Sequence, residues 1–133
     1  MRKAARNGVD VRVIVPQRSD ISPVLSAAQH FYDSYLQWGI RLFEWTGPML
    51  HAKMAVIDGE WSTIGSFNLD HRSLSHNQEV TVIVVDGAFG QQMEDMFNED
   101  FRRCHELSLA GWRTRSWGRH VRERWWAPFR ALM

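Results

Sequence analysis

Residues 51–68 read HAKMAVIDGEWSTIGSFN and carry one spacing pattern, H-x-K-x4-D-x6-G-S-x-N. A lone H-x-K pair would mean little, but the whole string is rarely met by chance in a chain of 133 residues. The apolar residues of 49–58 alternate along the chain, which predicts a β-strand. The pair Asp58-Gly59 predicts a tight turn, and residues 61–67 return as a second strand. Its fixed positions are His51, Lys53, Asp58, Gly65, Ser66 and Asn68.

These side chains suit chemistry at a phosphodiester. On a strand, residues two apart point to the same face, so His51 and Lys53 are expected side by side. Ser66 and Asn68 repeat that spacing, and Gly65 would let a phosphate approach the backbone closely. Lys53, Ser66 and Asn68 supply positive charge and hydrogen-bond donors for phosphate oxygens. A neutral imidazole at His51 can itself attack phosphorus.

The pattern resembles the HKD motif of the phospholipase D superfamily. The resemblance implies a phosphohistidine intermediate, and a second histidine from a second motif that serves as acid and base. It also implies that an acidic residue near position 79 orients the nucleophile, which makes Glu79 the candidate. Asp58 and Gly65 are expected to be structural members of the motif. His51, Lys53 and Glu79 are therefore the predicted catalytic residues.

The flanking sequence is similar to the C-terminal half of bacterial cardiolipin synthases of the phospholipase D type. The similar stretches include GVDVRVIVP at 8–16 and HFYDSYLQWGIRLFEW at 30–45. The resemblance implies phosphatidyl transfer with phosphatidylglycerol as donor and acceptor, no metal and no cofactor. It implies phospholipid rather than nucleic acid as partner, at the cytoplasmic side of a bacterial cell membrane. The sequence holds one H-x-K-x4-D string, so a second HKD half is expected, from upstream in the same polypeptide or from a homodimer partner.

Two other functions stay open. A homodimeric phosphodiesterase or nuclease of the same superfamily would also use a single motif per chain. An inactive half-domain that binds anionic membranes would fit the single motif as well. A zinc site built from His51, His71 and His76 is not expected, because no cysteine or carboxylate cluster has metal-ligand spacing; His71, Arg72 and His76 are assigned to a loop near the substrate.

The order of predicted elements indicates an α/β fold, a mixed β-sheet flanked by helices, as in a phospholipase D-like half-domain. Residues 1–8 read as the end of a helix, which suggests a portion of a larger protein. The apolar run at 79–85 predicts a strand buried on both faces. The catalytic half-domain is predicted at 1–104. The other predicted elements are strands at 9–16 and 40–45, a helix from Ser22 through Trp38 that stops at Gly39, and an amphipathic helix at 87–103.

Residues 105–133 form a basic, tryptophan-rich tail with six arginines and two glutamates. Arginine and tryptophan together favour a basic amphipathic helix lying on an anionic membrane. A helix that covers the domain's own core is the alternative, and a nucleic-acid surface is a third. The single cysteine, Cys104, excludes an intrachain disulfide and fits a reducing compartment. No apolar run is long enough for a spanning helix or a signal peptide.

Overall fold

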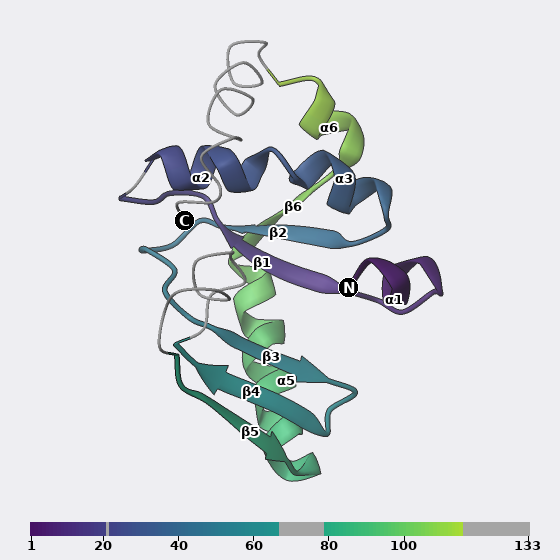
Figure 1. Cartoon of the computed structure of the whole chain (residues 1–133), viewed down its shortest axis with the longest axis vertical. Helices are drawn as coiled ribbons and strands as arrows, with labels where there is room; N and C mark the ends of the chain where they lie inside the picture. The colour runs from purple at the N-terminus through teal and green to yellow at the C-terminus, as the bar shows by residue number, and fades with distance from the viewer. Residues whose placement is uncertain (21, 67–78, 116–133) are drawn as a thin grey trace. The chain divides into compact units, whose positions relative to one another are not determined.

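The computed structural model describes residues 1–20, 22–66 and 79–115 and shows a mixed α/β chain (Figure 1). It confirms the predicted fold class, but with two separate three-stranded sheets in place of one. Each sheet belongs to its own compact unit. Of the described residues, the first unit holds Met1–Leu50 and those from Arg103 onward, and the second holds His51–Arg102.

The first unit has a sheet in the order β1-β2-β6. Strands β1 and β2 run parallel, with Val13 opposite Leu42, and β6 pairs antiparallel with β2, with Leu42 opposite Leu107. Its elements are α1 (Arg2–Arg6), β1 (Arg12–Pro16), α2 (Ser22–Gln29), α3 (Tyr32–Gln37), β2 (Arg41–Trp45), β6 (Cys104–Leu107) and α6 (Leu109–Arg113).

The core of this unit joins residues from distant parts of the sequence. Val15, Tyr32, Ile40, Leu42 and Trp112 form one buried cluster, and Leu42 is completely enclosed. The rings of Tyr32 and Trp112 lie 5.1 Å apart, which attaches α6 to α3. Burial of rings of this size dominates the stability of a small core.

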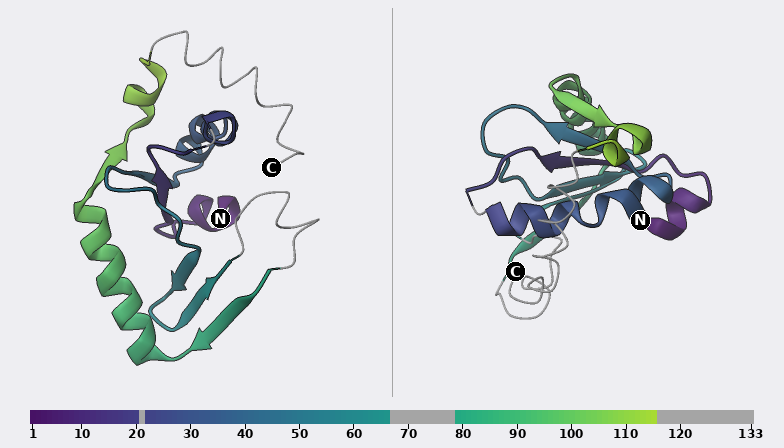
Figure 2. Two further views of the ribbon diagram at one scale, coloured as in Figure 1. Left: turned by 90° about the vertical axis from the view of Figure 1, so that its left-hand side faces the viewer. Right: turned by 90° about the horizontal axis from the view of Figure 1, so that it is seen from above.

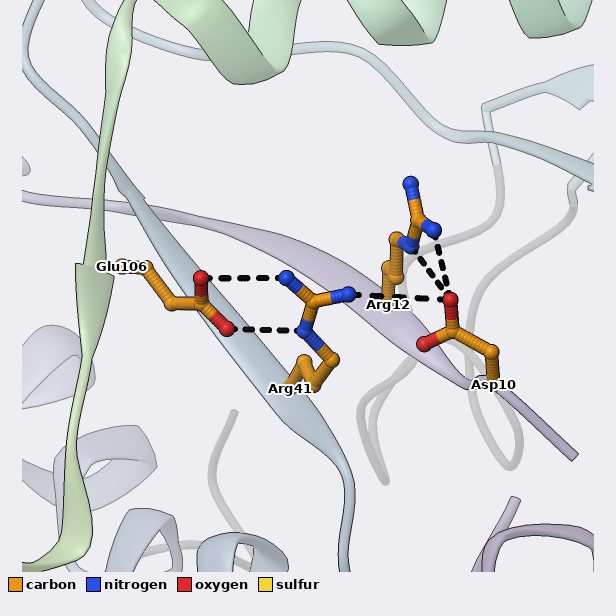
Figure 3. Close-up of polar contacts among 4 residues, drawn as sticks. All are labelled: Asp10, Arg12, Arg41 and Glu106. Carbon is orange, nitrogen blue, oxygen red and sulfur yellow. Dashed lines mark hydrogen bonds and ion pairs between the residues drawn. The ribbon is translucent and has the colours of Figure 1, made fainter. Parts of the chain in front are cut away.

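A charge network crosses the three strands of the first unit (Figure 3). Arg41 on β2 donates from Nε and Nη2 to the Glu106 carboxylate on β6, at 2.7 and 3.1 Å. Its Nη1 lies 3.6 Å from Asp10, which Arg12 also binds at 2.6 Å. Hydrogen bonds from Arg12 lower the pKa of Asp10, and those from Arg41 lower the pKa of Glu106.

The second unit is an antiparallel sheet in the order β3-β4-β5 with one long helix, α5. Its elements are β3 (Met54–Ile57), β4 (Trp61–Gly65), β5 (Thr81–Val85) and α5 (Gly87–Arg102). The predicted turn between β3 and β4 is confirmed: Asp58 and Gly59 have φ of 52° and 63°, the positive values that a type I′ turn needs. Helix α5 lies along one face of this sheet (Figures 1 and 2).

The first unit departs from the sequence-based expectation in its helices. The helix predicted from Ser22 to Trp38 is two helices, because the chain turns tightly at His30 and Phe31. There the Phe31 N–H bonds to the Ala28 carbonyl, three residues back instead of four. The predicted end at Gly39 is confirmed, with a φ of +83°.

The second unit departs from expectation in two of its strands. β3 begins at Met54, so His51 and Lys53 precede the strand instead of sharing its face. The prediction that the 79–85 strand is buried on both faces is wrong for this chain. In β5, Val82, Ile83 and Val85 are 57%, 59% and 75% exposed, because β5 is the last strand of its sheet.

The start of the predicted tail belongs to the first unit. Residues 104–113 form β6 and α6, and Ser108 caps α6 by accepting a hydrogen bond from the Gly111 N–H at 3.0 Å. Trp112 is 5% exposed, and Arg113 binds Asp33 on α3 at 2.7 Å. The tail beyond residue 115 lies outside the described residues. Within the described part, no helix is long and apolar enough to cross a membrane.

Candidate active site

His51 and Lys53 lie on the short segment that leads into β3. His51 is exposed, so its imidazole is open to a substrate, and Lys53 is half-buried. The Lys53 ammonium donates a hydrogen bond to the His51 carbonyl at 3.0 Å. This bond holds the Lys53 ammonium beside the backbone of His51, although the two residues do not share the face of a strand.

The end of β4 connects this segment to the rest of the motif. The Gly65 N–H donates to the Lys53 carbonyl at 3.0 Å, which continues the β3–β4 register by one residue. The next residue turns the other way: the Ser66 N–H donates to the Val80 carbonyl at 2.9 Å. Gly65, the last residue of β4, thus holds the His51–Lys53 segment on one side, and Ser66, which follows it, holds the chain entering β5 on the other.

Ser66 and Glu79 form the second part of the site. The Ser66 hydroxyl donates to Glu79 Oε2 at 2.5 Å and accepts from the Val80 N–H at 3.1 Å. Hydrogen bonds to a carboxylate are short and strong. The hydroxyl predicted to bind phosphate is therefore engaged with the carboxylate predicted to orient His51. The orienting role of Glu79 stays a prediction.

Gly65, expected to be a structural member of the motif, packs against a partner that the sequence did not indicate. A Cβ at this position would lie closer than 3.0 Å to the Val80 carbonyl oxygen and to Cα and Oγ1 of Thr81. The missing side chain therefore makes room for β5. The Val80 backbone, which pairs with Ser66, was also not predicted; a main-chain group carries no signal in the sequence.

The remaining predicted residues are placed as follows. Asp58 lies in the turn between β3 and β4. Asn68, His71, Arg72 and His76 lie outside the described residues. Among those that are described, no three histidine, cysteine, aspartate or glutamate side chains gather in a way that would hold a metal ion.

The fold matches that of a phospholipase D family member. The crystal structure of Nuc from Salmonella typhimurium, a phospholipase D family member, superposes with a TM-score of 0.68. The match covers 80% of this chain and 70% of that one at 21% sequence identity, so it shows the shared fold.

Within that class, the chain belongs to the family described as cardiolipin synthase, PLD-like domain, whose model matches residues 1–101. Cardiolipin synthase A of Pseudomonas putida (strain GB-1) is 40% identical over 108 residues, which are 81% of this chain. Cardiolipin synthase A of Cronobacter sakazakii is 34% identical over 130 residues, or 98% of this chain. The chain spans only 22% and 27% of the length of these two relatives.

Proposed function

We propose that this chain is one catalytic half of a cardiolipin synthase-type phosphatidyltransferase. The observation that carries the proposal is the end of β4, where Gly65 binds the His51–Lys53 segment and Ser66 binds Glu79. This arrangement brings the segment that carries an imidazole and an ammonium, and a hydrogen-bonding carboxylate, to the same end of the second sheet. The family match supports phospholipid as the substrate.

The reaction takes two steps. The imidazole of His51, or that of its partner histidine, attacks the phosphorus of phosphatidylglycerol. A P–N bond forms, and the bond between phosphorus and the oxygen of the head-group glycerol breaks. The other histidine gives its proton to the departing glycerol. The glycerol hydroxyl of a second phosphatidylglycerol then loses its proton to that histidine and attacks phosphorus, breaking the P–N bond and releasing cardiolipin. Lys53 stabilises the negative charge of the phosphoryl oxygens in both steps.

The second motif comes from the rest of a longer polypeptide. The two synthases above are several times longer than this chain, which leaves room for a second half in the same protein. We place the working enzyme peripherally on the cytoplasmic side of a bacterial membrane, held there by the basic tail. No metal or organic cofactor is needed, because side-chain cations and histidines supply the chemistry.

A lipid assay tests the proposal. The chain and its His51→Ala and His30→Ala variants are incubated with phosphatidylglycerol liposomes, alone and with the remainder of the Pseudomonas putida synthase as a second polypeptide. When the second polypeptide is present, mass spectrometry is expected to detect cardiolipin and free glycerol with the unaltered chain and with His30→Ala, whose exposed histidine lies in the first unit. His51→Ala is expected to fold and to lose turnover by at least about 1,000-fold, as expected when a nucleophile or general acid is removed.

Three results would contradict the proposal. Cardiolipin formation by His51→Ala would remove His51 from the mechanism. Cleavage of DNA or of a small phosphodiester, without any cardiolipin, would favour the homodimeric phosphodiesterase. No turnover of any substrate, even with the second polypeptide bound, would favour an inactive membrane-binding half-domain.

A further inference from the structure

The segment that carries His51 is held by few main-chain contacts. Residues 46–53 connect β2 to β3 and form neither a helix nor a strand (Figure 1). Within the described part of the chain, residues 46–52 make no hydrogen bond from one main-chain group to another. The first such bond after β2 is the one at Lys53, whose carbonyl accepts from the Gly65 N–H. The conformation of this segment must therefore be fixed in another way.

Side chains supply the missing contacts. Three side-chain donors bind main-chain carbonyls in or beside the segment. The hydrogen bonds run from Trp45 Nε1 to Pro48 at 2.7 Å, from Thr46 Oγ1 to Arg103 at 2.7 Å, and from Lys53 Nζ to His51 at 3.0 Å. The bond from Trp45 is the one that lies within the turn leading out of β2.

The indole of Trp45 packs directly against the main chain of Gly47. A Cβ at Gly47 would lie 2.8 Å from the ring atoms Cε2, Cζ2 and Nε1 of Trp45. The missing side chain therefore lets the ring fold back over the turn and reach the Pro48 carbonyl. Trp45 is itself well anchored, because its main chain pairs with Pro16 on one side and with Cys104 on the other.

The hydrogen bond at Pro48 lies close to the catalytic histidine along the chain. Only Met49 and Leu50 separate Pro48 from His51. The Pro48 carbonyl is held by Trp45, and the His51 carbonyl is held by Lys53. A catalytic group must be kept within about 0.5 Å of its productive position. Two fixed carbonyls, three residues apart, restrict the main chain in just that way.

We propose that Trp45 is a positioning residue of the transferase reaction. Its indole N–H, packed against Gly47, fixes the Pro48 carbonyl and thereby the main chain that carries His51. The inference rests on the proposed role of His51 in phosphatidyl transfer. Trp45 acts only through the chain and contacts no reacting atom. A misplacement of about 1 Å can slow a reaction about 100-fold, so loss of this hydrogen bond lowers the rate without removing a lipid-binding group.

Two substitutions disrupt the contact in different ways. Trp45→Phe keeps a ring and removes the N–H donor. Gly47→Ala places a Cβ against the indole, and because a side chain and not the backbone has to move, the fold is expected to survive. With the remainder of the Pseudomonas putida synthase present, each is expected to lower kcat at least about ten-fold and to change KM for phosphatidylglycerol by less than about two-fold.

Matched controls separate this effect from a general loss of stability. Trp38→Phe makes the same change at another half-buried tryptophan of the first unit, and Gly87→Ala adds a methyl group where there is open space. Both are expected to leave kcat unchanged. The double variant Trp45→Phe/Gly47→Ala is expected to lose little more activity than either single variant, because both disrupt one contact.

Nuclear magnetic resonance of the isolated chain gives a readout that needs no turnover. The Trp45 indole N–H is expected to exchange with solvent at least about ten times faster in Gly47→Ala than in the unaltered chain. The imidazole signals of His51 are expected to shift in Trp45→Phe and in Gly47→Ala, and to stay in place in Trp38→Phe.

The outcomes that would overturn the proposal are distinct from those that would overturn the proposed function. An unchanged kcat in folded Trp45→Phe, a rise in KM alone, or an equal loss of activity in Trp38→Phe would each overturn it. If even the unaltered chain forms no cardiolipin, the proposed function fails and the magnetic resonance measurement decides. His51 signals that move in both variants would then support the positioning role, and signals that stay in place would refute it.

Discussion

At the scale of single residues, the hydrogen bond between Ser66 and Glu79 is the contact to measure first. It joins two groups that the sequence placed in separate roles, one on phosphate and one on histidine. We expect Ser66→Ala and Glu79→Gln to destabilise the fold non-additively, with a coupling free energy of about 0.5–1.5 kcal/mol, because a charged acceptor strengthens the bond. A double-mutant cycle in urea denaturation checks this, and strictly additive effects would show that the bond contributes nothing to the free energy of unfolding.

Gly90 gives a second prediction at this scale. Alanine usually stabilises a helix relative to glycine by roughly 0.5–1 kcal/mol. At Gly90, however, a Cβ would lie closer than 3.0 Å to the Gly59 carbonyl and the Glu60 nitrogen, which are backbone atoms of the β3–β4 turn. Gly90→Ala is therefore expected to lower the free energy of unfolding by about 1–3 kcal/mol.

Gly87→Ala is the matched control, because that position in the same helix has open space within 4 Å of a Cβ. It is expected to be neutral or stabilising in thermal and urea denaturation. Equal effects of the two substitutions would show that the contact between α5 and the turn does not constrain the fold.

The sequence predicted which residues belong to the site better than it predicted which hydrogen bonds these residues make. The spacing from His51 to Ser66 indicated which side chains belong together, and the structure brings Lys53 to His51 and Glu79 to Ser66. It could not indicate that Ser66 turns toward Glu79, because that depends on the register of β4 against β5. The packing role of Gly65 depends on the same register.

At the scale of elements, the charge network on β1, β2 and β6 makes the stability of the first unit depend on pH. The folded-state pKa values of Asp10 and Glu106 lie below the ordinary 3.8 and 4.5. Their contribution is therefore complete above these ordinary values and is lost as the pH falls through the lowered ones. Because the side chains are 39–48% exposed, solvent screens each pair to about 0.2–1 kcal/mol.

Arg41→Met tests the network. The substitution is expected to destabilise the chain by about 0.5–1 kcal/mol near neutral pH, and by much less at an acid pH below the lowered pKa values of Asp10 and Glu106, where both carboxylates are protonated. Urea denaturation at both pH values measures this, with Arg18→Met as a control at an exposed arginine. A loss that stays constant from neutral to acid pH would point to the packing of the Arg41 stem instead of its charge.

Most elements could be predicted from sequence because their signals are local. The glycines that end helices, the Asp58-Gly59 turn and the amphipathic pattern of α5 are examples. The failures have a tertiary cause. β3 starts later than predicted because β4 ends at Gly65. The next residue, Ser66, bonds through its N–H to Val80, so the residues before Lys53 have no strand to pair with. The apolar sequence of β5 is typical of a buried strand. Its burial, however, depends on other elements that pack against it, and the described residues leave most of it exposed.

At the scale of the whole molecule, the described part of the tail, up to residue 115, belongs to the first unit. Trp112 is part of the first unit's core, Arg113 binds Asp33, and the Arg115 guanidinium lies over the Trp112 ring. Deleting residues 112–133 is therefore expected to cost about 3–5 kcal/mol through loss of the tryptophan. Deleting only 116–133 is expected to preserve these contacts and to weaken binding to anionic liposomes.

Thermal unfolding and liposome co-sedimentation separate the two effects. Trp112→Ala in the full-length chain is the control, since it disturbs the core and leaves residues 116–133 in place. Undiminished liposome binding after deletion of 116–133 would assign the membrane contact to another surface.

The pairing of β2 with β6 has a consequence for how the chain is made. Residues leave the ribosome in order, and the first unit lacks its third strand until Cys104–Leu107 has emerged. All of His51–Arg102 has by then been synthesised. During translation, the second unit, which carries the catalytic motif, can therefore form its sheet first. In the first unit, β2 lacks its antiparallel neighbour until β6 has been synthesised.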